Sequence, residues 1–184
     1  MSDAVSPSPG PVIRPSFQED VAAIQAIYGH HVLHGLASFE EVPPDAAEMA
    51  RRREAILARG LPFLVAEMDG EVLGFAYAGA YRERAAYRNT LEDSVYVRAD
   101  AISRGVGGRL LAALIGQSAA LGYRQMLAVI GDSGNAGSIG VHARAGFREV
   151  GVMQAVGFKH GRWVDVVIMQ RALGEGDGLP PERS

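Results

Sequence analysis

The chain has 184 residues, enough for one domain with a substantial core, and its apolar content of 48% and charged content of 21% are ordinary for a globular protein. Its net charge of -3 argues against nucleic acid as a partner, because binding to a phosphate backbone needs a basic face. Cysteine is absent, which excludes disulfides, thiolate metal ligands and a cysteine nucleophile, and no apolar run approaches the ~18 residues that span a membrane.

Both ends of the chain differ from its middle. The first residues are rich in proline and serine and lack a basic, apolar signal segment. We therefore expect a flexible tail over residues 1–11, a single domain over residues 12–173 and a second flexible tail over residues 174–184. The lack of cysteine and of a signal segment fits a cytoplasmic protein that has no membrane partner.

The first quarter of the domain predicts a strand and two helices. Residues 12–14 read as a short strand, and Ser16 with Glu19 has the spacing of a capping box at the start of a helix that runs to Val32. Asp45 begins a second helix that ends near residue 60. Three consecutive arginines, residues 51–53, read as a solvated face of that helix.

Strands and helices then alternate. Two apolar runs around Asp69-Gly70 predict a hairpin, because Asp-Gly is a typical hairpin turn. The further predicted elements are a strand over 90–97, a helix over 106–121, a strand over 126–129, a helix from Asn135 to about Gly146, and strands over 150–156 and 164–169. This order predicts an α/β domain with a mixed sheet.

A glycine-rich turn joins the strand at 90–97 to the long helix that follows it. Its residues are Ser103, Arg104, Gly105, Val106, Gly107 and Gly108. Glycines let the backbone approach a ligand closely, and the first turn of a helix presents free N–H groups that favour phosphate. Leu110 stands where a dinucleotide-binding motif has its third glycine, and the lysine of a P-loop is missing. A turn without any ligand is the structural alternative, and a nucleotide-binding module remains a weaker one.

The run Ile102-Ser103-Arg104-Gly105-Val106-Gly107 resembles the acetyl-CoA loop of the GNAT N-acetyltransferases, although Ile102 stands where glutamine or arginine is usual. Further strings resemble the phosphinothricin and methionine sulfoximine (sulfone) acetyltransferase branch: Ser38-Phe39-Glu40, residues 87–97, and the uncommon Phe-Lys-His-Gly-Arg-Trp-Val-Asp of residues 158–165. The resemblance implies the GNAT acyl-CoA N-acyltransferase fold, a mixed, mostly antiparallel sheet flanked by helices. It also implies acetyl-CoA as co-substrate, no metal, and a homodimer.

Acetyl transfer to an amine requires a base, stabilisation of the thioester oxygen, and a proton for the leaving thiolate. The resemblance implies Glu92 as the base, within reach of the acyl end of the coenzyme; an ion pair with Arg84 or Arg88 is the structural alternative. His142 is the candidate proton donor, as a neutral imidazole near pH 7, and a histidine bonded within the helix packing explains it equally well.

Backbone donors and the pantetheine arm complete the expected coenzyme site. The resemblance implies that Val95, Tyr96 and Val97 diverge from the neighbouring strand and leave N–H groups for the thioester and the pantetheine amides. Asn135 and Ser138, in the first turns of the later helix, are candidates for binding pantetheine, although Asn135 is also a plain N-cap.

The substrate side is indicated by an arginine-rich loop directly before Glu92. An arginine fork suits a planar carboxylate or a phosphinate or sulfonyl oxygen pair, so we expect a small amino-acid-like amine held there; a solvated loop is the alternative. The predicted substrate residues are Phe39, Glu40, Arg82, Arg84, Ala85, Ala86, Tyr87, Arg88, Glu92, Asp93 and Ser94. His30, His31 and His34 lack a carboxylate at ligand spacing and predict no metal site.

The sequence thus predicts an acetyl-CoA-dependent N-acetyltransferase acting on the α-amine of phosphinothricin, methionine sulfoximine or methionine sulfone by direct attack. Two alternatives stay open: a protein N-terminal or lysine acetyltransferase, and a non-catalytic acyl-CoA sensor.

Overall fold

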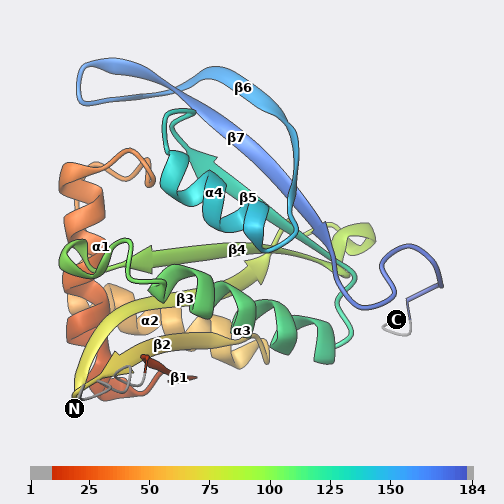
Figure 1. The fold of residues 1–184 in the computed structure, drawn as a ribbon, viewed down its shortest axis with the longest axis horizontal. Helices are drawn as coiled ribbons and strands as arrows, with labels where there is room; N and C mark the ends of the chain where they lie inside the picture. Colours follow the sequence, from red (N-terminus) through yellow and green to blue (C-terminus); the bar gives the residue numbers. More distant parts are fainter. Residues whose placement is uncertain (1–9, 182–184) are drawn as a thin grey trace, which may run out of the picture.

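A seven-stranded sheet organises the protein (Figure 1). The computed structural model describes residues 10–181, so residues 1–9 and 182–184 of the two predicted tails lie outside it. The strand order is β1-β2-β3-β4-β5-β7-β6, and every neighbouring pair is antiparallel except β4 and β5, which are parallel. This confirms the predicted α/β class with a mixed, mostly antiparallel sheet.

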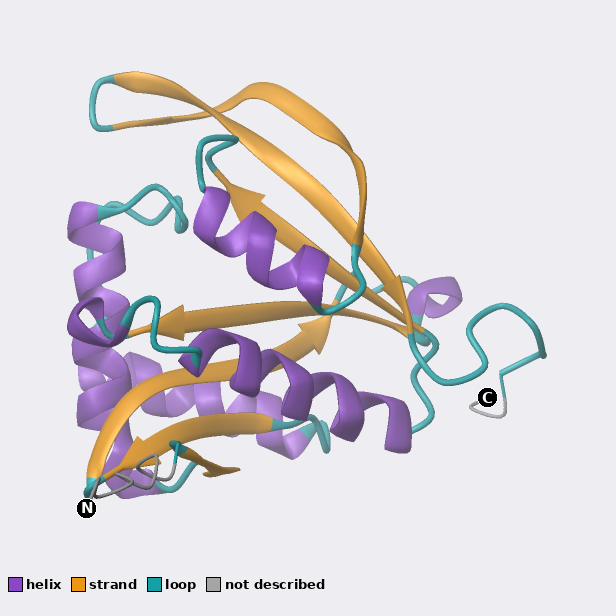
Figure 2. Cartoon of the chain, viewed as in Figure 1, coloured by secondary structure: helices purple, strands orange, loops and turns teal. Residues whose placement is uncertain are grey.

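The elements follow the predicted order, with longer strands near the C-terminus. The first half contains β1 (Val12–Pro15), α1 (Val21–His34), α2 (Ala46–Ala58), β2 (Phe63–Met68) and β3 (Glu71–Ala80). The second half contains β4 (Thr90–Val97), α3 (Val106–Ala120), β5 (Gln125–Gly131), α4 (Ala136–Arg144), β6 (Arg148–Lys159) and β7 (Arg162–Ala172). Figure 2 distinguishes the helices, in purple, from the strands, in orange.

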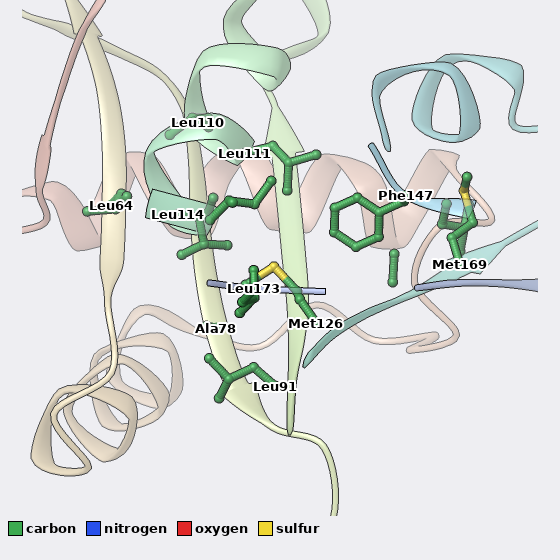
Figure 3. Packing of buried hydrophobic residues seen from close by; sticks show 14 of the residues in the cluster. Leu64, Ala78, Leu91, Leu110, Leu111, Leu114, Met126, Phe147, Met169 and Leu173 are labelled. Atoms are coloured by element: carbon green, nitrogen blue, oxygen red, sulfur yellow. The ribbon is translucent and has the colours of Figure 1, made fainter. Parts of the chain in front are cut away.

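Each face of the sheet carries its own helices and its own core. α3 packs on one face, where Leu110, Leu111 and Leu114 meet Leu91 of β4 and Met126 of β5 (Figure 3). On the other face, α1 and α2 pack against a second apolar cluster. Its buried residues are Val21, Ile24, Ile27, Tyr28, Val32, Met49, Phe63, Val65 and Phe75. Neighbouring residues of a strand point to opposite faces, so β4 contributes side chains to both cores.

The two parallel strands stay paired over only half their length. Backbone pairing runs from Thr90 with Gln125 to Asp93 with Ala128 and then stops. Beyond that point β4 and β5 separate into a V, with α4 nearby (Figure 1). The divergence that the family resemblance implied is therefore present in the structure.

The predicted capping box at Ser16 and Glu19 is wrong. Asp20 caps the turn instead, since its carboxylate accepts a hydrogen bond from the Phe17 N–H at 2.7 Å. Ser16 is buried and accepts a bond from Arg53, at 2.8 Å from Oγ to Nε. Arg53 is thus buried too, which corrects its assignment to a solvated face.

The described part of the C-terminal segment forms turns rather than a helix or strand. Leu173 donates its N–H to Arg124 O, and the Gly176 N–H bonds back to Leu173 O. Its mobility stays a prediction.

Candidate active site

The glycine-rich turn takes the strained backbone that its sequence suggested. Gly105 has a φ of 78° and forms the N-cap of α3 without any side-chain capping bond. Ser103 also has a positive φ, 65°. A left-handed conformation favours glycine, and a helix start without a side-chain cap leaves its first N–H groups open to an anion. A helix start of this kind is suited to an anion such as phosphate.

A cavity of about 740 Å³ opens from this turn into the V between β4 and β5. Its size lies within the range of small-molecule sites. It is lined by His31, His34, Gly35, Leu36, Ala37, Val95, Tyr96, Val97, Ala101, Ile102, Ser103, Gly105, Val106, Gly107, Gly108, Gly131, Asp132, Asn135, Gly137, Ser138, Val141, His142 and Arg144.

Every predicted coenzyme residue except one lines this cavity. The exception is Arg104, whose side chain is exposed. Asn135 also caps α4, since its Oδ1 accepts the Ser138 N–H at 3.1 Å. Capping and cavity lining thus coexist at this residue.

The open edge of β4 faces the cavity. β4 pairs with β3 up to Val97, but its other edge has no strand partner after Asp93 within the described sheet. Backbone N–H groups along that edge are available to a ligand. His31 lies at one end of this strand edge, where its Nε2 is 2.9 Å from Val97 O. Burial lowers the pKa of His31, although the bond to Val97 O acts in the opposite direction. The sequence gave His31 no role beyond the rim of a pocket.

A loop over residues 35–41 covers part of the cavity and is tied down at several points. Its Leu36 carbonyl lies so close to Gly131 that a Cβ there would approach it to 2.3 Å, so the end of β5 needs glycine. The Lys159 ammonium of the β6–β7 hairpin donates to Ser38 O at 2.7 Å, and burial lowers the pKa of that lysine. Sequence alone gives no pairing between residues 121 positions apart.

Phe39 and Glu40, predicted to bind substrate, lie on this loop. The Phe39 ring packs against Gly157 of β6 and is 40% exposed. Glu40 accepts bonds from Tyr28 and Arg52, both at 2.7 Å. Burial, the largest single influence, opposes its charge, but the bonds from Arg52 and Tyr28 and the charges of Arg52 and Lys159 together lower the pKa of Glu40.

Glu92 projects from the sheet face opposite α3. Its neighbour Leu91 belongs to the core beneath α3, whereas Ser94 sits opposite Tyr77 on the α1 and α2 side, and alternation places Glu92 with Ser94. Glu92 lines neither the large cavity nor the smaller one beside it. Burial, and next the charge of Asp93, raise the pKa of Glu92. The nearest opening in the sheet is the gap between β4 and β5, which begins after Asp93, the next residue of the strand.

His142 is almost fully buried and bonded at both ring nitrogens. Nε2 lies 2.9 Å from the Asp93 carboxylate, and Nδ1 lies 2.8 Å from Ser138 O. Burial, the largest single influence, disfavours the charged ring, but the bond to Asp93, the charge of Asp93 and the bond to Ser138 O together raise the pKa of His142. This direction is opposite to the one that would favour the neutral imidazole expected from the sequence. Asp93, predicted to bind substrate, has this ring as its partner.

The arginine-rich loop lies at the other end of β4 from the glycine turn. With eight residues between them, β4 separates the two by about 25 Å. Arg82 packs over the Tyr81 ring, and Tyr87 meets Tyr81 edge to face. None of Arg82, Arg84, Ala85, Ala86, Tyr87 and Arg88 lines the two cavities beside β4. Arg82 does act on Glu92, since its charge opposes the rise in the pKa of that carboxylate.

The described residues contain no cluster of three or more histidine, aspartate and glutamate side chains arranged to hold a metal. Nor does any helix in residues 10–181 have the length and apolarity needed to cross a membrane.

Residues 13–168 match the sequence profile of the acetyltransferase (GNAT) domain. The chain belongs to the GNAT acetyltransferase family. It is 57% identical over 164 residues to a phosphinothricin N-acetyltransferase from Alcaligenes faecalis, covering 89% of this chain and 83% of that protein. It is 44% identical over 169 residues to an L-methionine sulfoximine/L-methionine sulfone acetyltransferase from Pseudomonas paraeruginosa, covering 91% and 98%.

A solved GNAT structure is also closely similar. The phosphinothricin acetyltransferase from Sinorhizobium meliloti, in complex with acetyl-CoA, superposes with a TM-score of 0.92 at 45% identity and covers 96% of this chain and 95% of its own. The GNAT fold, the N-acetyltransferase activity and acetyl-CoA as its co-substrate are thereby established for this chain. The cavity fits that coenzyme, since it joins a helix start suited to phosphate with an open strand edge suited to amides.

Proposed function

We propose that this acetyltransferase acts in the cytoplasm on the α-amine of a small amino-acid-like substrate of the phosphinothricin, methionine sulfoximine or methionine sulfone type. The observation that supports it best is that one cavity extends from the glycine turn to the gap between β4 and β5. The chain that forms this cavity is 57% identical to a phosphinothricin acetyltransferase. Acetyl-CoA supplies an activated thioester when bound.

Direct attack needs the amine and the thioester to meet. In our proposal the amine approaches from the α1 and α2 face, where Glu92 projects, and the coenzyme occupies the cavity on the other side of the gap. Glu92 takes a proton from the substrate ammonium, since an ammonium has no lone pair. Its raised pKa supports this role, because a base works best with a pKa near the working pH.

The open edge of β4 provides the second contribution. N–H groups of residues 95–97 donate to the thioester oxygen as it gains charge, and further donors hold the pantetheine amides. His142 gives a proton to the departing thiolate. The chain has no cysteine to carry an acetyl group, which supports one-step transfer.

The acid end of the substrate is assigned to the arginine-rich loop, with Phe39 and Glu40 at the opposite border. The loop supports this assignment by its charge and by the action of Arg82 on Glu92. A guanidinium binds two oxygens of one group, which suits a carboxylate, a phosphinate or a sulfone.

A thiol-release assay tests the proposal without background, because the enzyme contains no thiol. The amines are phosphinothricin, methionine sulfoximine, methionine sulfone, methionine itself, and a short peptide with a free N-terminus. We expect turnover with the three amino acids whose side chains carry a phosphinate, sulfoximine or sulfone group. With methionine, whose side chain has no oxygen, kcat/KM should be at least tenfold lower. Faster acetylation of the peptide would replace this proposal with a protein N-terminal acetyltransferase, and acetyl-CoA binding without turnover of any amine would favour a sensor.

We also propose a homodimer built on the β6–β7 hairpin. β6 is an edge strand, and Phe158 and Trp163 are 57% and 67% exposed there beside several exposed valines. Such an apolar edge favours association. Light scattering should give twice the chain mass for the wild type and a single mass for Phe158→Ser/Trp163→Ser. A monomeric wild type would refute the dimer without touching the enzymatic proposal.

A further inference from the structure

The His142 ring lies between two groups that both accept hydrogen bonds. The Asp93 carboxylate faces Nε2 at 2.9 Å, and the Ser138 carbonyl faces Nδ1 at 2.8 Å. A neutral imidazole has one N–H and can satisfy only one acceptor. The contacts to Asp93 and to Ser138 O are both hydrogen bonds only if the pair of side chains carries one additional proton; a neutral ring would leave Nδ1 to accept from the Ser138 hydroxyl, which lies farther away at 3.4 Å. The geometry therefore favours an additional proton on this pair, at the wall of the cavity.

Burial makes this pair mutually dependent. The exposed fractions of the His142 and Asp93 side chains are 5% and 1%. The second carboxylate oxygen of Asp93, Oδ1, is buried and has no hydrogen-bond partner among the described residues. The charge of Asp93 is therefore compensated mainly through the ring. An unpaired buried carboxylate would be costly, which favours a positively charged ring beside it.

Among residues 10–181, the ion pair found for the ring is the one with Asp93. The Phe147 ring packs on it edge to face at 5.1 Å. The other titratable groups that line the same cavity are His31, His34, Tyr96, Asp132 and Arg144. On β4 the next charged group is Glu92, whose side chain projects from the opposite face of the strand.

We propose that Asp93 is a positioning residue: it holds His142 by Nε2 as a charged ring and leaves the proton on Nδ1 for the departing thiolate. This rests on the proposed function. As the carbon–sulfur bond breaks, the Nδ1–H bond breaks and a sulfur–hydrogen bond forms. The ring then remains as the tautomer protonated at Nε2 and bonded to Asp93. Ser138, which lines the cavity, relays this proton through its Oγ, 3.4 Å from Nδ1.

Asp93 acts on both ends of the reaction in the same direction. As an opposite charge it raises the pKa of His142 against the effect of burial, and as a like charge it adds to the rise in the pKa of Glu92 that burial causes. Replacing the carboxylate with an amide should lower both values. In the profile of activity against pH, the acid limb depends on the pKa of Glu92 and the alkaline limb on the pKa of His142. Both limbs should therefore move to lower pH.

The decisive variant is Asp93→Asn, which keeps the shape of the side chain and removes its charge. Its matched control is Asp69→Asn, the same change in the exposed turn between β2 and β3, at a residue that lines neither cavity beside β4. We expect kcat for Asp93→Asn to fall and both limbs to shift down by about 1 unit or more, the usual effect of one nearby charge. The control should keep the wild-type profile. A lower kcat with unmoved limbs would show a merely structural role and overturn the proposal.

Imidazole ¹⁵N spectra provide a readout that needs no turnover. In the wild type at pH 7 both nitrogens of His142 should be protonated, and in Asp93→Asn the ring should become neutral at lower pH. A neutral wild-type ring at pH 6 would overturn the proposal even if the enzyme acetylates every predicted amine. Conversely, a protonated ring in a protein that acetylates none of them would refute the proposed substrate alone. Should Asp93→Asn fail to fold, the wild-type spectra still decide.

Discussion

Gly108→Glu should make the protein more stable and its coenzyme affinity weaker. Gly108 is the third residue of α3 and lines the cavity, and a Cβ there would meet nothing within 4 Å. Glutamate is a far better helix former than glycine and favours the positive end of the helix dipole. We expect about 1 kcal/mol of added stability and a Tm higher by about 2–4 °C.

The same carboxylate would face the diphosphate of acetyl-CoA if the helix start holds it. Two like charges about 5 Å apart near a protein surface repel by about 3 kcal/mol. Solvent and salt screening reduce this to about 1–2 kcal/mol, which raises Kd about 5–30-fold. The matched control is Gly116→Glu, later in α3, where a Cβ also meets nothing and the side chain lies outside the cavity. Both variants change the net charge equally.

Calorimetric titration with acetyl-CoA, combined with thermal unfolding, measures both quantities. Gly116→Glu should bind within about twofold of the wild type, and the affinity loss in Gly108→Glu should shrink as salt increases. If the two variants bind acetyl-CoA equally well, the amides at the start of α3 do not hold a phosphate. That result would remove the basis for placing the acyl end in the gap between β4 and β5.

Two further predictions follow from buried groups. Glu92→Gln should lower kcat by about 10²–10⁴-fold while the Kd for acetyl-CoA stays unchanged, because Glu92 lies outside the cavity. Burial and, next, the charge of Asp93 raise the pKa of Glu92. As the pH is lowered, wild-type activity should therefore fall at a pH above the pKa of an ordinary carboxyl group. An unchanged kcat in Glu92→Gln would exclude Glu92 as the base. Arg53→Met should lower the free energy of unfolding by about 2–4 kcal/mol, because it removes the hydrogen bonds of a charged group to Ser16. The Arg51 side chain is 75% exposed, so Arg51→Met should change that free energy by less than about 0.5 kcal/mol. Thermal unfolding compares the two, and equal effects would contradict the burial of Arg53.

The arginine run shows why some of these features escape sequence analysis. Residues 51–53 share one type and one helix, so local composition treats them alike. Arg53 is buried only because α2 turns that position toward Ser16, which precedes α1 in the chain. Helix packing decided this, and no local pattern records it. The capping box failed for the same reason, since Ser16 is occupied by Arg53.

Local chemistry determined much of the architecture from the sequence itself. The Asp-Gly turn, the glycine-rich loop and the apolar periodicity of α3 act over a few residues, and strings shared with the family located the coenzyme loop. The tertiary structure decided which face of β4 carries each carboxylate. Apolar residues follow one another along Val95–Val97, because β4 is covered on both sides, and such a run hides the alternation that would assign Glu92 and Asp93 to opposite faces. The pairing of Asp93 with His142, 49 positions later, exists only because β4, β5 and α4 pack together.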